Sequence, residues 1–389
     1  MANNKIGKKN ASGHYLSRKE VRSIAKANAK VMRELEAKKF RKCDESEYLS
    51  EMKDPANILE IDGLHSYFFT DQGVVKAVNG VSFEIPAGST VGVVGESGCG
   101  KSVTSMSVMR LLQGPTGQIV EGSIRFRSND GKVYDIAEMP MSEIHRIRGN
   151  QISMIFQEPM TSLNPVFTIG EQLDEVTLIH VPGATKESAK AKSMEMLELV
   201  GIAAPERVYK AFPHELSGGM RQRVMISMAL ACDPRLIIAD EPTTALDVTI
   251  QAQILDLLRD LKDRIDGSIM LITHDLGIIA EMADYVVVMY AGRVIEQGTV
   301  KEIFHDPKHP YTIGLQKSKP TMRSGNESDT LFNISGNVPN PVNMPNHCFF
   351  KERCSQCKAK CSGDYPCMVQ VSPTHYVACH LYTEEENNG

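Results

Sequence analysis

A glycine-rich loop with a single lysine carries the clearest chemistry in this sequence. An apolar, β-branched run precedes the loop and a helix-like run follows it, which is the setting of a phosphate-binding loop. The glycines expose backbone N–H groups that can wrap a polyphosphate, the lysine can reach the β- and γ-phosphates, and the serine can bind Mg²⁺. We therefore predict a site for ATP and Mg²⁺. The nucleotide-contacting residues would be Gly95, Glu96, Ser97, Gly98, Cys99, Gly100, Lys101 and Ser102.

Two adjacent carboxylates follow a second apolar run, 236–239. The carboxyl end of a strand is where an α/β sheet presents ligand-binding groups. Asp240 comes directly after the run and is placed to hold Mg²⁺, either directly or through water. Glu241 is then available to accept a proton from the attacking water. Together with the phosphate loop, this pair predicts hydrolysis of ATP.

A second anion-binding feature lies about 20 residues before these carboxylates. Ser217 is in the cap position of a predicted helix, and Gly218 and Gly219 expose N–H groups at its positive end. Alone, a Ser-Gly-Gly sequence is an ordinary helix cap. One phosphate loop combined with an anion site that lacks a lysine favours a two-chain sandwich. In it, the serine-glycine site of each chain would cover the ATP of the other.

The composition is that of an ordinary soluble protein, with 23% charged residues, 42% apolar residues and a net charge of −5. A chain of 389 residues is expected to form two or three domains. No apolar run approaches the roughly 18 residues that span a bilayer, and the polar N-terminus does not resemble a secretion signal. We expect a cytosolic protein that reaches a membrane only through a partner.

Basic residues are concentrated at the N-terminus, where residues 1–42 hold 13 Lys and Arg against three acidic residues. The first 16 residues are polar and are expected to be disordered. A capping box from Ser17 to Glu20 starts a predicted amphipathic basic helix that reaches about Phe40. Such a helix either packs weakly on its neighbour with a solvated face or binds anionic lipid or RNA.

The elements that would position the chemical groups change in type along the chain. Four strand-like runs precede the phosphate loop and predict an antiparallel sheet. A charged helix is expected over 141–148 and mostly helical structure over 160–230. Strands and helices then alternate up to a strand pair at 285–297, and beyond about Phe304 the pattern loosens into a proline-rich tail. The four early strands are predicted at 58–61, 67–69, 74–78 and 81–85.

The order of these motifs resembles the ATP-binding-cassette (ABC) family over about residues 57–320. The resemblance implies an α/β fold: a phosphate-loop ATPase core with an antiparallel β subdomain and a helical signature subdomain, here followed by a cysteine-rich C-terminal extension. The chain is therefore expected to divide into a basic, partly helical N-terminal extension at 1–55, the ATPase domain at 56–304 with its helical subdomain at 159–230, and a C-terminal domain of oligopeptide-importer type at 305–389.

The family resemblance also implies roles for individual residues. Gln157 would link Mg²⁺ and the attacking water to a contact with the membrane domains, and His274 would hold the γ-phosphate and the catalytic glutamate in register. Asp247 would lie at the dimer seam. Phe68, or its neighbour Tyr67, would stack on adenine.

Several stretches resemble the oligopeptide and dipeptide importer branch, among them 212–223, 243–253 and 309–312. The resemblance implies an ATPase subunit, peripheral on the cytoplasmic face of the cell membrane, that energises peptide import. Its partners would be a paralogous ATPase, two membrane permeases that contact a groove near 157–165, and an extracellular solute-binding lipoprotein. An importer of nickel or another small solute is the near alternative. A soluble ABC ATPase acting on nucleic acid or ribosomes is favoured only by the basic arm, and we expect no nucleic acid.

Six of the nine cysteines fall between 348 and 379, a density that favours metal ligation over disulfides in a reducing compartment. Four of them match the spacing at the end of importer ATPases, for some of which a [4Fe–4S] cluster is implied. Structural zinc and unmetallated thiols are the alternatives. Two further cysteines and three histidines nearby leave the ligand set open. The matching four are Cys348, Cys354, Cys361 and Cys379.

Overall fold

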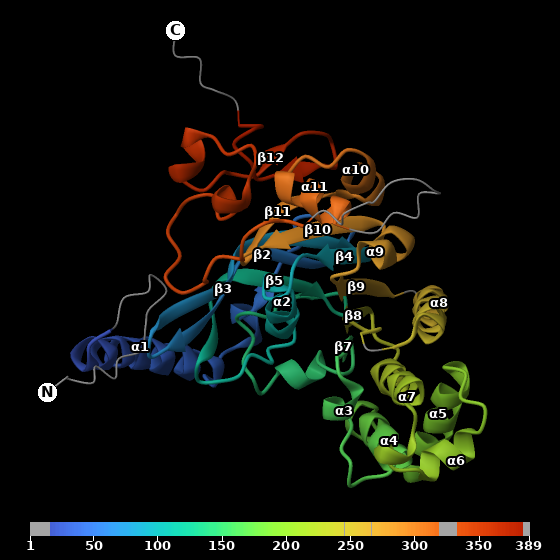
Figure 1. Ribbon diagram of the computed structural model, residues 1–389. Coiled ribbons are helices and arrows are strands. Elements are labelled where there is room, and N and C mark those ends of the chain that lie inside the picture. Colours follow the sequence, from blue (N-terminus) through green and yellow to red (C-terminus); the bar gives the residue numbers. More distant parts are fainter. Residues whose placement is uncertain (1–15, 245, 266, 319–332, 384–389) are drawn as a thin grey trace, which may run out of the picture.

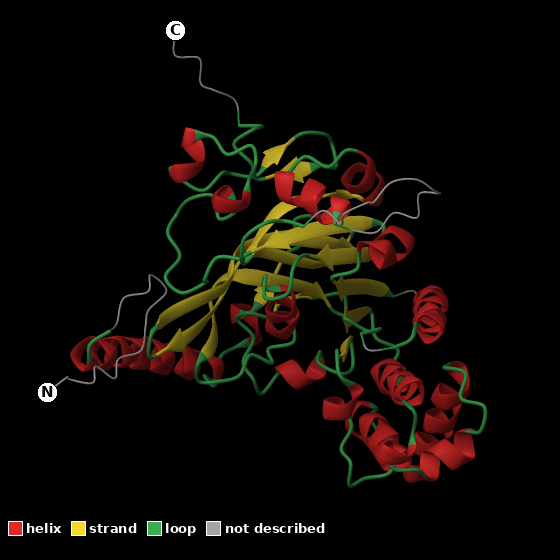
Figure 2. Cartoon of the chain, in the orientation of Figure 1, coloured by secondary structure: helices red, strands yellow, loops and turns green. Residues whose placement is uncertain are grey.

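The computed structural model describes residues 16–244, 246–265, 267–318 and 333–383, and the predicted polar tail before Leu16 lies outside them. Figure 1 shows two sheets at the centre, a long helix on the left, a helical arm at the lower right and a small C-terminal layer above the sheets. Strands fill the middle of the molecule and helices surround it (Figure 2). The predicted α/β class is therefore confirmed.

The core is an eight-stranded sheet in the order β12-β13-β11-β10-β4-β9-β8-β7. The strands from β10 to β7 are parallel to their neighbours, whereas β11 runs antiparallel to β10. Alternate side chains enter opposite hydrophobic layers, so that Ile237 lies in one and Ile238 in the other. The strands are β4 (Thr90–Val94), β7 (Ile152–Ile155), β8 (Leu236–Asp240), β9 (Ser268–Thr273), β10 (Tyr285–Tyr290), β11 (Arg293–Thr299), β12 (Val369–Gln370) and β13 (Tyr376–Val377).

The second sheet is antiparallel, as predicted, with five strands in the order β1-β6-β5-β2-β3. The four early strands expected from the sequence are, however, only two long ones. The predicted turn at Gly80 is an irregular point inside β3, where φ is 81° and the pairing with β2 shifts register. The strands are β1 (Leu49–Ser50), β2 (Asn57–Thr70), β3 (Gly73–Pro86), β5 (Gly117–Arg127) and β6 (Val133–Asp135).

Helices cover the large sheet and form the separate arm. α2 (Lys101–Val108) follows the phosphate loop, and α8 (Val248–Ile265) and α9 (Leu276–Met282) follow β8 and β9. The region expected to be mostly helical contains the arm, in which α4, α5, α6 and α7 pack on one another. The arm helices are α3 (Pro159–Ser162), α4 (Ile169–His180), α5 (Lys186–Leu199), α6 (Pro205–Lys210) and α7 (Gly218–Leu230), with the 3₁₀ helix η3 (Pro213–Glu215) before α7.

The prediction of a helix over 141–148 is wrong. This segment holds only the 3₁₀ helix η2 (Ile144–Arg146), in which the backbone N–H groups of Arg146 and Ile147 bond three residues back. In 3₁₀ geometry, residues three apart lie on the same side, so both Ile144 and Ile147 turn inward and are buried.

The N-terminal helix α1 (Arg18–Lys39) has the predicted capping box at Ser17 and Glu20. It packs against β2 and β5 of the antiparallel sheet. Its buried Asn28 donates from Nδ2 to the carbonyl oxygen of Thr70, at 2.7 Å, at the end of β2. Most of its basic side chains are exposed, which agrees with packing on a neighbour with a solvated face. The short 3₁₀ helix η1 (Glu45–Glu47) follows it.

The C-terminal region is more regular than its sequence suggested. α10 (Val300–His305) and α11 (Pro310–Lys317) follow β11, and the two-residue strands β13 and β12 extend the core sheet beyond β11. Along the chain, the 3₁₀ helices η4 (Lys351–Arg353) and η5 (Ala359–Ser362) lie between α11 and β12. Among the described residues, every helix is too short or too polar to cross a membrane.

Candidate nucleotide-binding and catalytic site

The phosphate loop joins β4 to α2, as the sequence predicts. Gly95 and Gly100 have φ of 152° and 103°, and a Cβ atom would meet the carbonyl oxygen of Met289 at 2.2 Å in the first case and that of Ala77 at 2.4 Å in the second. Gly98 has nothing within 4 Å of its Cβ position. Glycine is therefore required where the loop passes other backbone, and it leaves the outer surface open for a ligand.

The loop side chains point in different directions. Lys101 donates from Nζ to the carbonyl oxygens of Gly95, at 2.7 Å, and Glu96, at 3.2 Å, so its ammonium lies inside the concave loop. Ser97 is exposed. The Cys99 thiol lies in the hydrophobic core, where burial raises its pKa, so only the backbone of this residue can contact a nucleotide.

The predicted Mg²⁺ ligands Ser102 and Asp240 lie together. The Ser102 hydroxyl donates to Oδ1 of Asp240 at 3.0 Å. Asp240 is 3% exposed, and burial raises the pKa of its carboxyl. A buried carboxylate beside a hydroxyl is an oxygen donor set suited to Mg²⁺, whose charge would offset the cost of burying the anion.

Glu241 is held by three side chains. Its Oε2 accepts from Nε2 of Gln157 at 3.0 Å and from the hydroxyl of Thr244 at 2.9 Å. Its Oε1 lies 3.2 Å from Nδ1 of His274. The backbone of Glu241 has a φ of 47° and donates from its N–H to Ile272 at 2.8 Å. This left-handed turn directly after β8 fixes the carboxylate beside the neighbouring strands.

The parallel sheet explains why these residues meet. Gln157 follows β7, Asp240 and Glu241 stand at the end of β8, and His274 follows β9, so all lie at the same edge as the phosphate loop after β4. The structure thus brings together the predicted catalytic and Mg²⁺-binding side chains. The sequence did not identify Thr244 as a partner of Glu241. Thr244 lies three residues after Glu241 in a turn, and the sequence of a turn does not indicate which side chain contacts an earlier residue.

The other predicted nucleotide contacts do not join this cluster. Ser217 caps α7, where its hydroxyl accepts from the N–H of Met220 at 3.3 Å, and Ser217 and Gly218 are exposed. Figure 1 shows α7 in the helical arm, well apart from α2. Asp247 is exposed and accepts from the N–H of Ile250 at the start of α8, at 3.0 Å. Ser217, Gly218 and Asp247 are thus left exposed by the fold of this chain.

The two aromatic candidates for adenine stacking lie on β2. Tyr67 is engaged, since its hydroxyl donates to Asn79 at 2.9 Å and contacts His65 at 3.0 Å. Phe68 is partly exposed and packs close to Gly117, where a Cβ atom would meet the ring at 2.9 Å. Of the pair, Phe68 has the ring that is free of polar partners.

Cys354, Cys361 and Cys379 lie close enough to Cys348 to act on its thiol. Burial raises the pKa of Cys348 and of Cys379 to about 11, with a smaller contribution from neighbouring thiols. Two of the three nearby histidines are bonded through Nε2: His375 bonds Glu296 at 2.8 Å, and His380 bonds the carbonyl oxygen of Asp364 at 3.0 Å. In the described ranges, no three His, Cys, Asp or Glu side chains are grouped to hold a metal ion.

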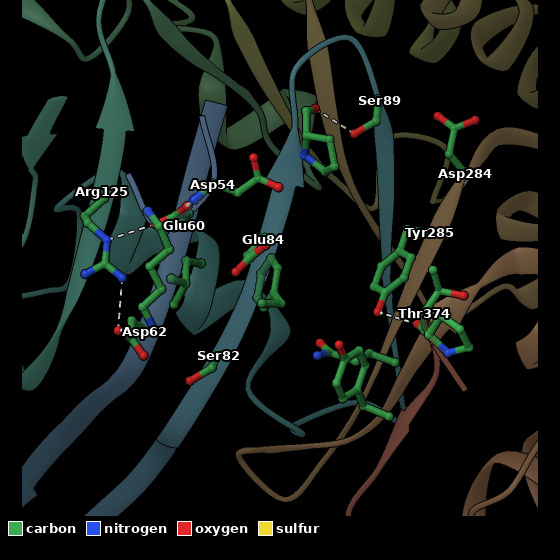
Figure 3. A pocket seen from close by; sticks show the side chains of 17 residues that line it. Asp54, Glu60, Asp62, Ser82, Glu84, Ser89, Arg125, Asp284, Tyr285 and Thr374 are labelled. Carbon is green, nitrogen blue, oxygen red and sulfur yellow. Dashed lines mark hydrogen bonds and ion pairs between the residues drawn. The ribbon is translucent and has the colours of Figure 1, made fainter. Parts of the chain in front are cut away.

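A cavity of about 680 Å³ lies elsewhere, between the antiparallel sheet, β10 and the C-terminal layer (Figure 3). Arg125 in its wall donates to Glu60 and Asp62, each at 3.0 Å. Ser89 precedes β4 and Asp284 precedes β10, so the cavity is at the amino edge of the parallel strands. The phosphate loop is at the opposite edge, and this cavity is therefore not the nucleotide site.

Comparison with known proteins agrees with the site geometry. Residues 78–244 match the family model described as "ABC transporter", and residues 295–361 match "Oligopeptide/dipeptide transporter, C-terminal region". Among solved structures, the ATP-binding cassette MJ0796, described as dimeric and bound to ADP and Pi, has a TM-score of 0.55 at 26% identity, covering 62% of this chain and 98% of that one.

Curated relatives match over most of their length. The oligopeptide transport ATP-binding protein AppD of Bacillus subtilis is 49% identical, over 85% of this chain and 98% of the relative. The oligopeptide transport ATP-binding protein OppD of the same organism is 51% identical, over 83% and 88%. The dipeptide transport ATP-binding protein DppD, also of B. subtilis, is 47% identical, over 83% and 94%.

Proposed function

This chain belongs to the ABC transporter family, and we propose that it is the ATP-hydrolysing subunit of an importer for oligopeptides or dipeptides. The observation that carries the chemistry is Glu241, held by Gln157, His274 and Thr244 beside the phosphate loop. The observation that carries the substrate class is the match of residues 295–361 to the C-terminal region of oligopeptide and dipeptide transporters.

Each residue then has a role in hydrolysis. Backbone N–H groups of the loop bind the phosphates, and Lys101 turns from the carbonyl oxygens of Gly95 and Glu96 to the β- and γ-phosphates. Glu241 accepts the proton of the attacking water. Mg²⁺ neutralises phosphate charge when bound, and Ser102, Asp240 and Gln157 would hold it. Gln157 and His274 keep the base oriented.

We propose that the site is completed by a second ATPase chain, a paralogous subunit. The serine-glycine helix start of the second chain would cover ATP in the phosphate loop of this chain. In return, Ser217, Gly218 and Gly219 of this chain would cover the ATP of the second chain. Asp247 would lie at the seam and Phe68 against adenine. Closure of the two chains on ATP and reopening after hydrolysis supply the movement that drives transport.

The movement would reach two membrane permeases through the segment after Gln157. Exposed apolar side chains gather there, since Met160 is 60%, Val166 71% and Phe167 48% exposed. In this arrangement the chain lies peripherally on the cytoplasmic face of the cell membrane, and an extracellular solute-binding lipoprotein delivers the peptide. The predicted ranges 1–55, 56–304 with the subdomain 159–230, and 305–389 remain our proposed division of the chain.

Lys101→Ala tests the nucleotide site directly. Removal of the ammonium should weaken ATP binding at least about tenfold, since charge-assisted bonds to the phosphates are lost. Titration with a fluorescent ATP analogue measures the effect, and Lys190→Ala in the helical arm is a matched control at an exposed lysine. Unchanged affinity in Lys101→Ala would contradict the proposal.

The transported solute needs a separate test. A strain from which the gene is deleted should lose uptake of labelled oligopeptides or dipeptides, and Glu241→Gln should fail to restore it. Loss of nickel uptake with peptide uptake intact would instead establish the alternative importer. Co-purification of nuclease-sensitive nucleic acid in place of permeases would favour the soluble class.

We retain a C-terminal [4Fe–4S] cluster, or zinc, at Cys348, Cys354, Cys361 and Cys379 only as a proposal from cysteine spacing. Anaerobic purification, elemental analysis and a visible spectrum test it. Colourless protein without iron or zinc would leave these residues as free thiols.

A further inference from the structure

The phosphate loop is joined to the C-terminal region by an ion pair between residues 257 positions apart. Arg353 donates from Nη1 to Oε2 of Glu96 at 2.7 Å and from Nη2 to Oε1 at 2.9 Å. The guanidinium thus meets the carboxylate fork to fork, which is the most directional ion pair that proteins form. The Arg353 side chain is 4% exposed and that of Glu96 is 28% exposed, so water screens the pair weakly.

Arg353 is fixed before it reaches the loop. Its Nε donates to the carbonyl oxygen of Ser335 at 3.1 Å, and its Nη2 also donates to that of Ile334 at 3.2 Å. The guanidinium carbon lies 5.8 Å from the ring centre of Tyr290 and 5.9 Å from that of Phe350. All three nitrogens are therefore engaged, and the guanidinium cannot turn away without breaking several contacts.

The backbone of Glu96 is held from the same side. Its N–H donates to the hydroxyl of Tyr311 at 2.8 Å, and Tyr311 is fully buried against the ring of Tyr290, with centroids 4.7 Å apart. The carbonyl oxygen of Glu96 accepts from Lys101 at 3.2 Å. One loop residue is thus bonded through its side chain and its N–H to the C-terminal region, and through its carbonyl to the lysine that faces phosphate.

We propose that Arg353 is a positioning residue for nucleotide binding, which holds the phosphate loop open and correctly shaped through Glu96. The inference rests on the proposed function only in taking this loop as the ATP site. Loss of the guanidinium would lower the affinity for ATP in two ways. ATP would have to order a looser loop, and an unpaired carboxylate would be left beside the triphosphate.

Arg353→Gln in the full-length chain tests the proposal. We expect the Kd for ATP to rise about tenfold, with less than about a twofold change in kcat at saturating ATP, because the group acts on binding and touches no reacting atom. Arg353→Lys keeps the charge without the fork and should raise the Kd about threefold. Glu352→Gln, next to Arg353 on η4 with a side chain 82% exposed, is the matched control and should bind ATP like the wild type.

A double-mutant cycle separates a specific path from general damage. If Arg353 acts through Glu96, the double variant Glu96→Gln, Arg353→Gln should bind ATP no more weakly than Glu96→Gln alone. Multiplying effects would show that Arg353 acts on the fold as a whole and would overturn the inference. An unchanged Kd in Arg353→Gln would overturn it as well.

The outcomes for the two proposals are distinguishable. If Lys101→Ala weakens ATP binding and Arg353→Gln does not, the nucleotide site stands and the inference fails. If neither changes the Kd, the proposed function itself fails. Should Arg353→Gln not fold, a cycle of Arg353→Lys with Glu96→Gln, both checked by thermal melting, decides the same question.

Discussion

Two glutamates at the phosphate site are held in opposite ways. Glu241 takes its partners from the ends of neighbouring strands, and one of them, His274, has a side chain that is 62% exposed. Glu96 takes its partners from the C-terminal region, and its arginine is 4% exposed. The difference separates a group that must exchange partners with water and phosphate from one that must stay in place.

The energetics of the two settings differ accordingly. A contact with an exposed histidine contributes little to stability, because water competes for both groups. Breaking the fork leaves the partly buried carboxylate of Glu96 without its partner, which is costly. Variants at Glu241 should therefore change the rate of hydrolysis, whereas variants around Glu96 should change affinity and stability.

The largest effect is expected at Glu241. Glu241→Gln keeps the shape and the hydrogen bonds from Gln157 and Thr244 but removes the base, so kcat for ATP hydrolysis should fall about a thousandfold. The Kd for ATP should remain within about twofold of the wild type. Steady-state phosphate release and equilibrium nucleotide binding measure the two quantities. Hydrolysis at the wild-type rate would remove Glu241 from the catalytic role.

A smaller effect is expected from Thr244. Thr244→Val keeps the shape of the side chain and removes the hydroxyl that bonds Glu241 at 2.9 Å, so kcat should fall about tenfold with little change in the Kd for ATP. Thr244→Ser is the control and should keep most of the activity. Activity kept in Thr244→Val and lost in Thr244→Ser would mean that the methyl group, not the hydroxyl, matters.

An effect on stability alone is expected in the pH dependence around Tyr311, whose hydroxyl accepts from the N–H of Glu96. Burial lowers the pKa of His309 to about 4, and its Nδ1 accepts from the N–H of Tyr311 at 3.0 Å, which requires a neutral ring. The unfolded state binds a proton near pH 6.5 and the folded state does not, so stability is present above pH 6.5 and is lost as the pH falls towards 4. The loss should be about 1 kcal/mol per pH unit.

His309→Asn provides the comparison, because asparagine keeps an acceptor at the start of α11 and does not titrate. Urea unfolding of both proteins between pH 7 and 4 measures the difference. The variant should show a flatter profile over this range. Parallel profiles would show that another group controls the acid sensitivity of this region.

The sequence was sufficient to predict the location of side chains that lie at the end of a strand. Gln157, Asp240 and His274 each come directly after or at the end of an apolar run, and parallel strands bring such positions to one edge. The phosphate-loop glycines could equally be predicted from the sequence. In the structure, other backbone passes Gly95 and Gly100 too closely for a side chain. The places of Asp240 and of the loop glycines needed only local structure and the rule that orders it, whereas the roles of Gln157 and His274 came from the family resemblance.

Contacts between distant segments could not be predicted in this way. The pair of Arg353 with Glu96 depends on where the C-terminal region folds back, and no spacing in the sequence reports that. The motif 309–312 was noticed only as a family likeness, although it supplies Tyr311 to the loop. The wrong predictions of a turn at Gly80 and of a helix over 141–148 have local causes. Gly80 lies inside β3, and 3₁₀ turns bury Ile144 and Ile147.

The position of Arg353 late in the chain has a consequence for biosynthesis. The ribosome completes the phosphate loop long before it releases the residues that pair with it, 257 positions later. A nascent or truncated subunit would carry Glu96 without its arginine and would hold ATP weakly. High affinity for nucleotide would then mark a chain that has been finished and folded, so incomplete subunits would be poor competitors for assembly into a transporter.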